Sequence, residues 1–247
     1  MPLFPFLVQY VSKNFLYIHH QMIVTLTVVR LRTWAIPLGF VSMAILRLPL
    51  VLNKKISFWK LMGCGKNGTF DKTPDLRQWS MLLVWQNETD YTTFRENSVV
   101  MKWWNLISDS EWTLQAVPFA AHGTWDKQEP FGRPNSKEIP EGKVAVLTRA
   151  SIRLHKLNGF WSNVPAVAQT MPTAPGYLYS VGIGEIPWIK QATFSVWDSL
   201  EDVKQFAYRQ REHAEVVKKT REQNWYSEEL FGRFIIQKTL GTPPFTL

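Results

Sequence analysis

The chain has 247 residues, of which 45% are hydrophobic and 19% are charged, and it contains no long low-complexity tract. This composition is typical of a folded globular protein with one large domain or two small ones. The single cysteine, Cys64, excludes an internal disulfide framework and a cysteine-rich metal cluster.

The net charge of +8 is concentrated in the first quarter of the chain. Residues 1–70 hold eight Lys and Arg and no Asp or Glu, whereas the remaining residues hold 20 of each sign. A basic and apolar segment favours an anionic membrane surface as partner, with a solvated basic face as the alternative. No motif that reads RNA or DNA accompanies it, so we expect no nucleic-acid partner.

Residues 1–21 lack a basic start and a small-residue cleavage site, so they are a poor signal peptide. We expect them to form an N-terminal extension that is loosely packed or disordered. The stretch WAIPLGFVSMAILRLPLVL, residues 34–52, is about the length that a membrane span needs. Pro37, Arg47 and Pro49 interrupt it, and a central arginine is costly in lipid. We therefore predict a buried or interfacial helix, with true insertion as the less favoured alternative.

The next segment, residues 22–124, predicts the element order β-α-β-β-α-β. Alternating β-branched and aromatic residues indicate strands, and longer apolar stretches indicate helices. Asn87 fits a helix N-cap, with Asp90 three residues later. The expected strands are 22–31, 56–65, 78–86 and 112–123, and the expected helices are 35–48 and the stretch from Asn87 through residue 107.

A linker rich in Pro, Gly and charged residues, 125–143, has no hydrophobic period. The same element order then recurs in residues 144–241. The two copies share the pattern W-x-[N/S]-x-x-D-x-x-x-F, which begins at Trp85 and at Trp197. The expected strands are 144–154, 177–185, 191–197 and 229–240, and the expected helices are 157–169 and the stretch capped by Ser199.

Each half has the ferredoxin-like order, which leaves one sheet face covered by helices and the other open. Two such halves can bury their open faces against each other. We therefore predict an α+β fold in which two tandem ferredoxin-like (βαββαβ) halves form an intrachain dimeric α+β barrel. The shared Trp and Phe residues are then expected in the core.

The two copies differ seven residues after the shared Phe, where Met101 follows Phe94 and His213 follows Phe206. Seven residues are about two helical turns, so both side chains should lie on the inward helix face. A histidine there is most often a core or edge residue. The alternative is an axial ligand to haem iron, which suits a neutral imidazole facing an apolar cavity. The chain has no HExxH, no 2-His-1-carboxylate spacing and no G-x-S-x-G motif.

Five long segments of the chain are distinctive: GTWDKQEPF (123–131), LTRASIRLHKLNGFWSNVP (147–165), VGIGEIPWIKQATFSVW (181–197), HAEVVKKTREQNWYSEELFGRF (213–234) and, in the first half, FWKLMGCGKNGTF (58–70). These segments resemble the spheroidene monooxygenase family, and the likeness runs from about residue 22 to about residue 239.

The resemblance implies a haem-dependent monooxygenase of carotenoid biosynthesis, an oxidoreductase of the ketolase type. Such an enzyme introduces a hydroxyl and then a keto group on an acyclic carotenoid such as spheroidene, with electrons from a ferredoxin-type donor. The related barrels include haem enzymes, which favours His213 as the iron ligand. The candidate cofactor-binding residues are His213, Arg149 and Arg153, the two arginines pairing with haem propionates. The candidate substrate-binding residues are Trp161, Trp188 and Trp225.

Each of these residues also has a purely structural alternative, because strand arginines often face solvent and tryptophans often fill a core. Two other functions also remain open at this point: a non-catalytic haem- or pigment-binding barrel protein, and a cofactor-independent oxygenase on the same fold. Because a carotenoid does not leave the bilayer unaided, we expect the protein in the cytoplasm, peripherally associated with the inner membrane.

Overall fold

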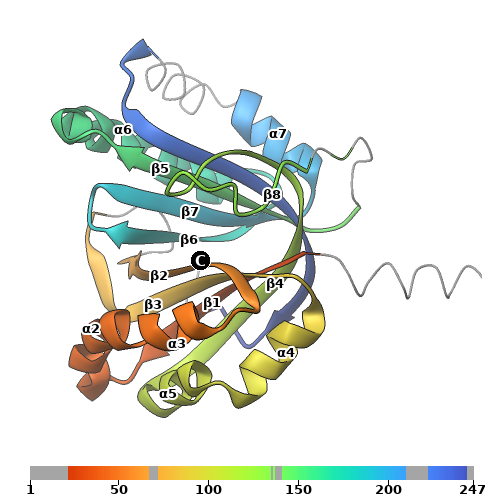
Figure 1. The fold of residues 1–247 in the computed structure, drawn as a ribbon. Helices are drawn as coiled ribbons and strands as arrows, with labels where there is room; N and C mark the ends of the chain where they lie inside the picture. The colour runs from red at the N-terminus through yellow and green to blue at the C-terminus, as the bar shows by residue number, and fades with distance from the viewer. Residues whose placement is uncertain (1–21, 67–71, 135, 137–140, 210–221, 244–247) are drawn as a thin grey trace, which may run out of the picture.

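A closed barrel of eight antiparallel strands forms the centre of the molecule (Figure 1). The computed structural model describes residues 22–66, 72–134, 136, 141–209 and 222–243. The first half contributes β1 (Ile23–Leu31), β2 (Ile56–Gly65), β3 (Pro74–Trp85) and β4 (Ser108–Gly123). The second contributes β5 (Val144–Ile152), β6 (Tyr177–Ile186), β7 (Lys190–Trp197) and β8 (Tyr226–Leu240).

The strand order around the barrel is β1-β3-β2-β6-β7-β5-β8-β4. Each half therefore has its fourth, first, third and second strands side by side, which is the ferredoxin-like arrangement. The halves join along a long seam between β4 and β8, and along a short one in which Gly63 and Cys64 of β2 pair with Gly184 and Ile183 of β6. The predicted α+β fold of two ferredoxin-like halves in one barrel is confirmed.

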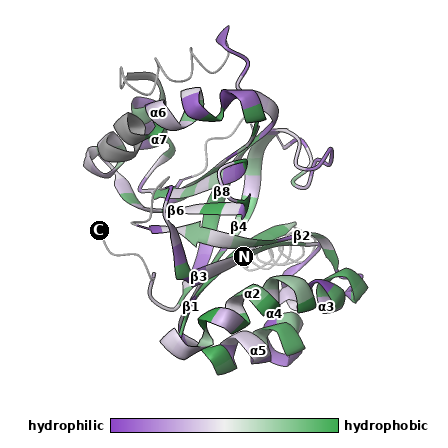
Figure 2. Cartoon of the chain, turned by 90° about the vertical axis from the view of Figure 1, so that its left-hand side faces the viewer, coloured by the Kyte–Doolittle hydropathy of each residue, from purple (hydrophilic) through white to green (hydrophobic). Residues whose placement is uncertain are grey.

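The helices lie outside the barrel, one set on each half (Figures 1 and 2). The first half carries the 3₁₀ turn η1 (Thr33–Ala35), α2 (Ile36–Ile45), α3 (Arg47–Leu52), α4 (Glu88–Asn97) and α5 (Val99–Ile107). The second carries η3 (Leu154–Lys156), α6 (Leu157–Thr170), η4 (Met171–Thr173) and α7 (Leu200–Arg209). Asn87 accepts a hydrogen bond from Asp90 N at 2.9 Å, and Ser199 Oγ accepts one from Asp202 N at 3.2 Å, so both predicted caps form.

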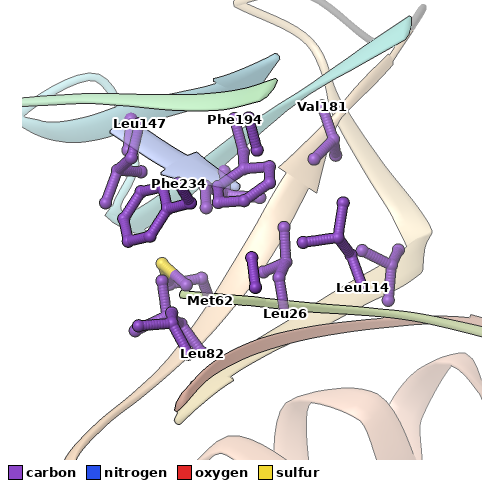
Figure 3. Close-up of a cluster of buried hydrophobic side chains, with 14 of the residues drawn as sticks. Leu26, Met62, Leu82, Leu114, Leu147, Val181, Phe194 and Phe234 are labelled. Atoms are coloured by element: carbon purple, nitrogen blue, oxygen red, sulfur yellow. The ribbon is translucent and has the colours of Figure 1, made fainter. Parts of the chain in front are cut away.

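The barrel interior is filled with apolar side chains from both halves. Figure 3 shows leucines of β1, β3 and β4 facing Leu147, Phe194 and Phe234 of the second half. Each of these is 0% or 1% exposed. Burial of one such side chain stabilises the fold by about 1.5–3 kcal/mol, so the two inner faces hold the halves together.

The segment predicted as a linker also contributes to this interior. Trp125 and Phe131 are 1% and 2% exposed and belong to the same apolar cluster. Trp125 Nε1 donates to Glu185 Oε1 at 2.7 Å, and the Phe131 ring meets the Phe234 ring edge-on at 5.0 Å between centroids. The segment therefore connects the halves and packs against the core that they share.

The helix predicted through residue 107 is wrong as a single element. Ser98 has extended backbone (φ −70°, ψ 145°), and its side chain accepts a hydrogen bond from Met101 N, which starts a second helix. The seven-residue spacing from Phe94 to Met101 therefore crosses a helix break and is not two helical turns. Both side chains are nevertheless buried, because both helices pack on the same sheet face.

Gly39 in α2 gives the first prediction, because a methyl group there would meet a rigid ring. An added Cβ would lie 2.5 Å from Trp79 Nε1 and 2.7 Å from Leu31 Cδ1. We expect Gly39→Ala to lower the free energy of unfolding by about 1–3 kcal/mol through overpacking, measured by urea unfolding. The matched control is Gly159→Ala in α6, whose Cβ would meet nothing closer than 3.7 Å. Equal stability of the two variants would contradict the packing of α2 on β3.

Candidate functional site

Four of the predicted site residues gather where β5 ends. The backbone N–H of Arg153 donates to Trp225 O at 2.8 Å, and Trp161 Nε1 donates to Trp188 O at 3.1 Å. Phe160 meets the rings of Trp161 and Trp225 edge-on, at 5.2 and 6.1 Å between centroids. Residues from α6, the β6–β7 turn and the start of β8 therefore form one aromatic cluster beside Arg153.

The three tryptophans have different environments within this cluster. Trp161 and Trp225 are buried, whereas Trp188 is 53% exposed and has a positive φ of 62° in the β6–β7 turn. Trp188 Nε1 also donates to Lys72 O of the first half at 3.3 Å. Trp161 and Trp225 are thus packed as a wall, and Trp188 is available at the surface.

A shallow depression of about 600 Å³ lies next to this wall, a size within the range of ligand pockets. Arg153 Nε is buried there and has no hydrogen-bond partner among the described residues. A buried guanidinium nitrogen without an acceptor favours an anionic ligand group. The depression is lined by Ser151, Ile152, Arg153, Leu154, His155, Ile189, Lys190 and Ser227.

Arg149 lies on the inner face of β5 and is 1% exposed. Its Nη1 donates to Glu228 Oε2 at 2.5 Å, and its Nη2 lies 3.7 Å from Glu185 and 3.9 Å from Asp126. The guanidinium carbon lies 5.4 Å from the Trp125 ring centroid, a cation–π distance. Three carboxylates thus already surround this arginine, and its pairing with a haem propionate stays a prediction.

Arg149 and the three carboxylates around it belong to a larger group of charged residues that includes two lysines. We call this group the barrel-end charge network; it comprises Lys60, Asp126, Arg149, Glu185, Lys190 and Glu228. Lys60 pairs with Asp126 and Glu185, and Lys190 Nζ lies 2.7 Å from Asp126 Oδ1. Burial alone would raise the pKa of Asp126, but hydrogen bonds from the two lysines outweigh it and lower the pKa to about 2. The network ties five strands (β2, β5, β6, β7 and β8) to the segment that carries Trp125. Its members are scattered from residue 60 to residue 228, so no sequence spacing could have revealed it.

The outer faces of the two half-sheets differ at equivalent positions. Trp85 pairs with Ile23 and Trp197 pairs with Val144, so the two tryptophans occupy the same place in the two halves. Counting along the strand pairs from these two tryptophans gives five further pairs of equivalent outer positions. At these positions the first half has Val29, Trp59, Leu61, Met81 and Leu83. The second half has, in the same order, Ala150, Ser180, Gly182, Thr193 and Ser195.

The larger first-half residues pack with α2–α5 in one continuous apolar cluster. In the second half the outer apolar residues divide into two clusters, one around Trp197 and Phe206 and one around Trp161 and Trp225. We call the five second-half residues the small-residue bed. Thr193 Oγ1 in this bed is buried and has no hydrogen-bond partner among the described residues. The other two hydroxyls of the bed have partners, Ser180 Oγ with Tyr177 Oη at 2.8 Å and Ser195 Oγ with Trp197 Nε1 at 2.9 Å.

Comparisons with known proteins agree with this fold. No family model matches the chain. A spheroidene monooxygenase of Rhodobacter capsulatus is 33% identical over 211 residues, which are 85% of this chain and 88% of that protein. One of Rubrivivax gelatinosus is 32% identical over 72% of this chain and 68% of that protein. The chain belongs to the spheroidene monooxygenase family.

A third relative, a spheroidene monooxygenase of Cereibacter sphaeroides, is 34% identical over 76% of this chain, and the match spans 58% of that longer protein. Among solved structures, an aldoxime dehydratase has a TM-score of 0.62 at 9% identity, covering 92% of this chain and 87% of that chain. A second aldoxime dehydratase, in complex with butyraldoxime, has a TM-score of 0.60 at 9% identity, covering 88% and 80%. These two similarities support the fold alone.

Both histidines in the described part of the chain are exposed. His122 stacks on Phe231, and His155 lines the depression beside Arg153. Burial raises the pKa of the Cys64 thiol to about 12, so this side chain stays protonated. No group of three or more His, Cys, Asp and Glu in this part of the chain could hold a metal ion. His213 lies outside the described residues, so its role as ligand stays a prediction.

The lowered pKa of Asp126 predicts a pH dependence of stability. A carboxyl group whose folded pKa is about 2 stabilises the fold above its unfolded value near 4, and this contribution is lost as the pH falls towards 2. We expect Asp126→Asn to be less stable than the wild type at neutral pH, with the gap closing between about pH 4 and pH 2 in urea unfolding. The control is Glu201→Gln, which removes an exposed pair with Lys204 and should cost little. A gap that is constant with pH would contradict the network.

Proposed function

We propose that this chain is a carotenoid monooxygenase of the ketolase type, acting on an acyclic carotenoid such as spheroidene. The observation that supports it is the 33% identity to a spheroidene monooxygenase over 85% of the chain. The substrate would be a long apolar polyene. Trp188, which is 53% exposed beside the buried Trp161 and Trp225, is the predicted tryptophan available to contact such a chain end.

The proposed reaction replaces C–H bonds at one carbon near the end of the polyene. Each round forms a C–OH bond with one oxygen atom of O₂, and the other atom leaves as water after taking up two protons and a pair of electrons. A second round on the same carbon gives a geminal diol, which loses water to leave the ketone. The electrons would come from a ferredoxin-type donor.

We propose haem as the cofactor, with His213 as its axial ligand. Bound haem would supply the activation of dioxygen. The small-residue bed supports this proposal, because it replaces bulky first-half side chains by small ones in the half that also carries His213. Within the described chain, Thr193 Oγ1 and Arg153 Nε are buried groups that could each hydrogen-bond to a bound group. Arg153 forms no ion pair among the described residues, whereas Arg149 already pairs with Glu228, so Arg153 is the better candidate to hold a propionate.

The first test of this proposal compares the absorption spectra of the purified wild type and of a variant that lacks the His213 side chain. We expect the wild type to show a Soret band and His213→Ala to lose it, because the iron then lacks its protein ligand. The control His122→Ala removes an exposed imidazole and should keep the band. A colourless, iron-free wild type would overturn the haem proposal and favour a cofactor-independent oxygenase, whereas a band retained in His213→Ala would overturn the ligand assignment alone.

The second test is product analysis in cells that accumulate acyclic carotenoids. We expect expression of the wild type to yield hydroxylated and keto carotenoids that carry ¹⁸O from labelled O₂, detected by mass spectrometry. A chain that binds pigment or haem but leaves the carotenoids unchanged, with an electron donor present, would contradict the enzymatic proposal. It would instead favour the non-catalytic binding protein.

A further inference from the structure

The segment from η1 to α3 is apolar on both of its sides. One side packs on the first half of the barrel through Ala35, Gly39, Ser42, Leu46 and Leu50, all buried. A helix that is hydrophobic all round normally has partners all round. The sheet supplies a partner for only one side of this segment.

The other side of this segment carries an array of exposed apolar side chains. Leu48, Val51 and Leu52 of α3 are 65%, 63% and 68% exposed, and α5, which contacts α3, adds Val99 and Leu106 at 63% and 62%. Figure 2 shows α2 and α3 largely in green on the outside of the barrel. We call this surface the α2–α3 face; it comprises Trp34, Phe40, Val41, Ile45, Leu48, Val51, Leu52, Val99 and Leu106.

Basic residues surround this face, and its own segment has no acidic residue between positions 33 and 54. Arg32, Arg47, Lys54 and Lys55 are all exposed. Arg32 pairs with Asp109 and Lys55 with Asp90, but Arg47 and Lys54 form no ion pair within the described residues. A large apolar patch with uncompensated positive charge at its edge is complementary to an anionic lipid surface.

The geometry of the segment favours lying on a membrane over crossing it. Residues Thr33–Leu52 are apolar and long enough to span by length and composition, and 28% of their most apolar 18-residue window is buried in the protein. α2 ends at Ile45 and α3 begins at Arg47, with Leu46 between them in right-handed helical backbone. Trp103 Nε1 of α5 donates to Ser42 Oγ at 2.8 Å, which ties α2 to the helix layer. The segment therefore lies flat on the barrel.

We propose that the α2–α3 face docks on the surface of an anionic bilayer, with its apolar side chains in the headgroup region and Arg47 and Lys54 on lipid phosphates. A second copy of this chain fits less well, because a twofold contact would bring the basic residues at the edge of one face close to the same basic residues of the other copy. The inference rests on the proposed function, since an enzyme with a carotenoid substrate needs access to a membrane. It adds which surface of the molecule makes that contact.

The test is co-sedimentation of the full chain with vesicles, without substrate. We expect binding to phosphatidylcholine vesicles that contain phosphatidylglycerol, much weaker binding to phosphatidylcholine alone, and weakening by salt. Leu48→Glu should lower the partition coefficient by at least about tenfold, because it removes a leucine side chain that would enter the headgroup region and adds repulsion from anionic lipid. Arg47→Gln and Lys54→Gln should each lower it by about fivefold. The matched control is Ile186→Glu, an exposed apolar residue on the second half, which should bind as the wild type does.

Three outcomes would overturn the proposal: no binding of the wild type to anionic vesicles, equal binding of Leu48→Glu and wild type, or an equal loss in Ile186→Glu. A wild-type dimer in light scattering that Leu48→Glu converts to a monomer would assign the face to self-association instead. Activity on a detergent-dispersed carotenoid is measured in parallel. If the protein does not bind vesicles but is active on the dispersed carotenoid, the docking surface alone is rejected. If it binds vesicles but is inactive on the dispersed carotenoid, the proposed function alone is rejected.

Discussion

The burial of two inner sheet faces against each other is the interaction on which the rest of this structure depends. Neither half-sheet could expose Leu26, Leu82, Phe194 and Phe234 to water, and closing the barrel buries them all. This closure fixes the pseudo-twofold relation of the halves. It also leaves both outer faces for the helices, so the outer faces can differ between the halves without opening the barrel.

That freedom explains why the outer faces differ. The first half uses Leu61, Met81 and Leu83 to pack its helices into one core, whereas Gly182, Thr193 and Ser195 occupy the same positions in the second half. The first half thus packs its helices in one apolar cluster, and the second half packs its helices through two separate apolar clusters.

Much of the architecture could be predicted from the sequence. Alternating apolar residues located all eight strands, and the repeated pattern at Trp85 and Trp197 marked the same strand end in each half. The caps at Asn87 and Ser199 form as their residue types predict, because capping is local chemistry. The helix break at Ser98 was missed, since an apolar period continues across it and the competing cap is a single serine.

The candidate site, like the fold, could be predicted from the sequence only in part. The sequence by itself determined the family and the fold, because long segments and a repeated strand pattern carry both. That Arg153, Trp161, Trp188 and Trp225 meet at the end of β5 was decided by the tertiary structure, since they come from segments far apart in the chain. Only the tertiary structure decided that Arg149 faces inward onto Glu228, that Trp125 packs in the core, and that the small-residue bed exists. Strand register sets which side chains share a face, and register depends on pairing between residues far apart in the chain.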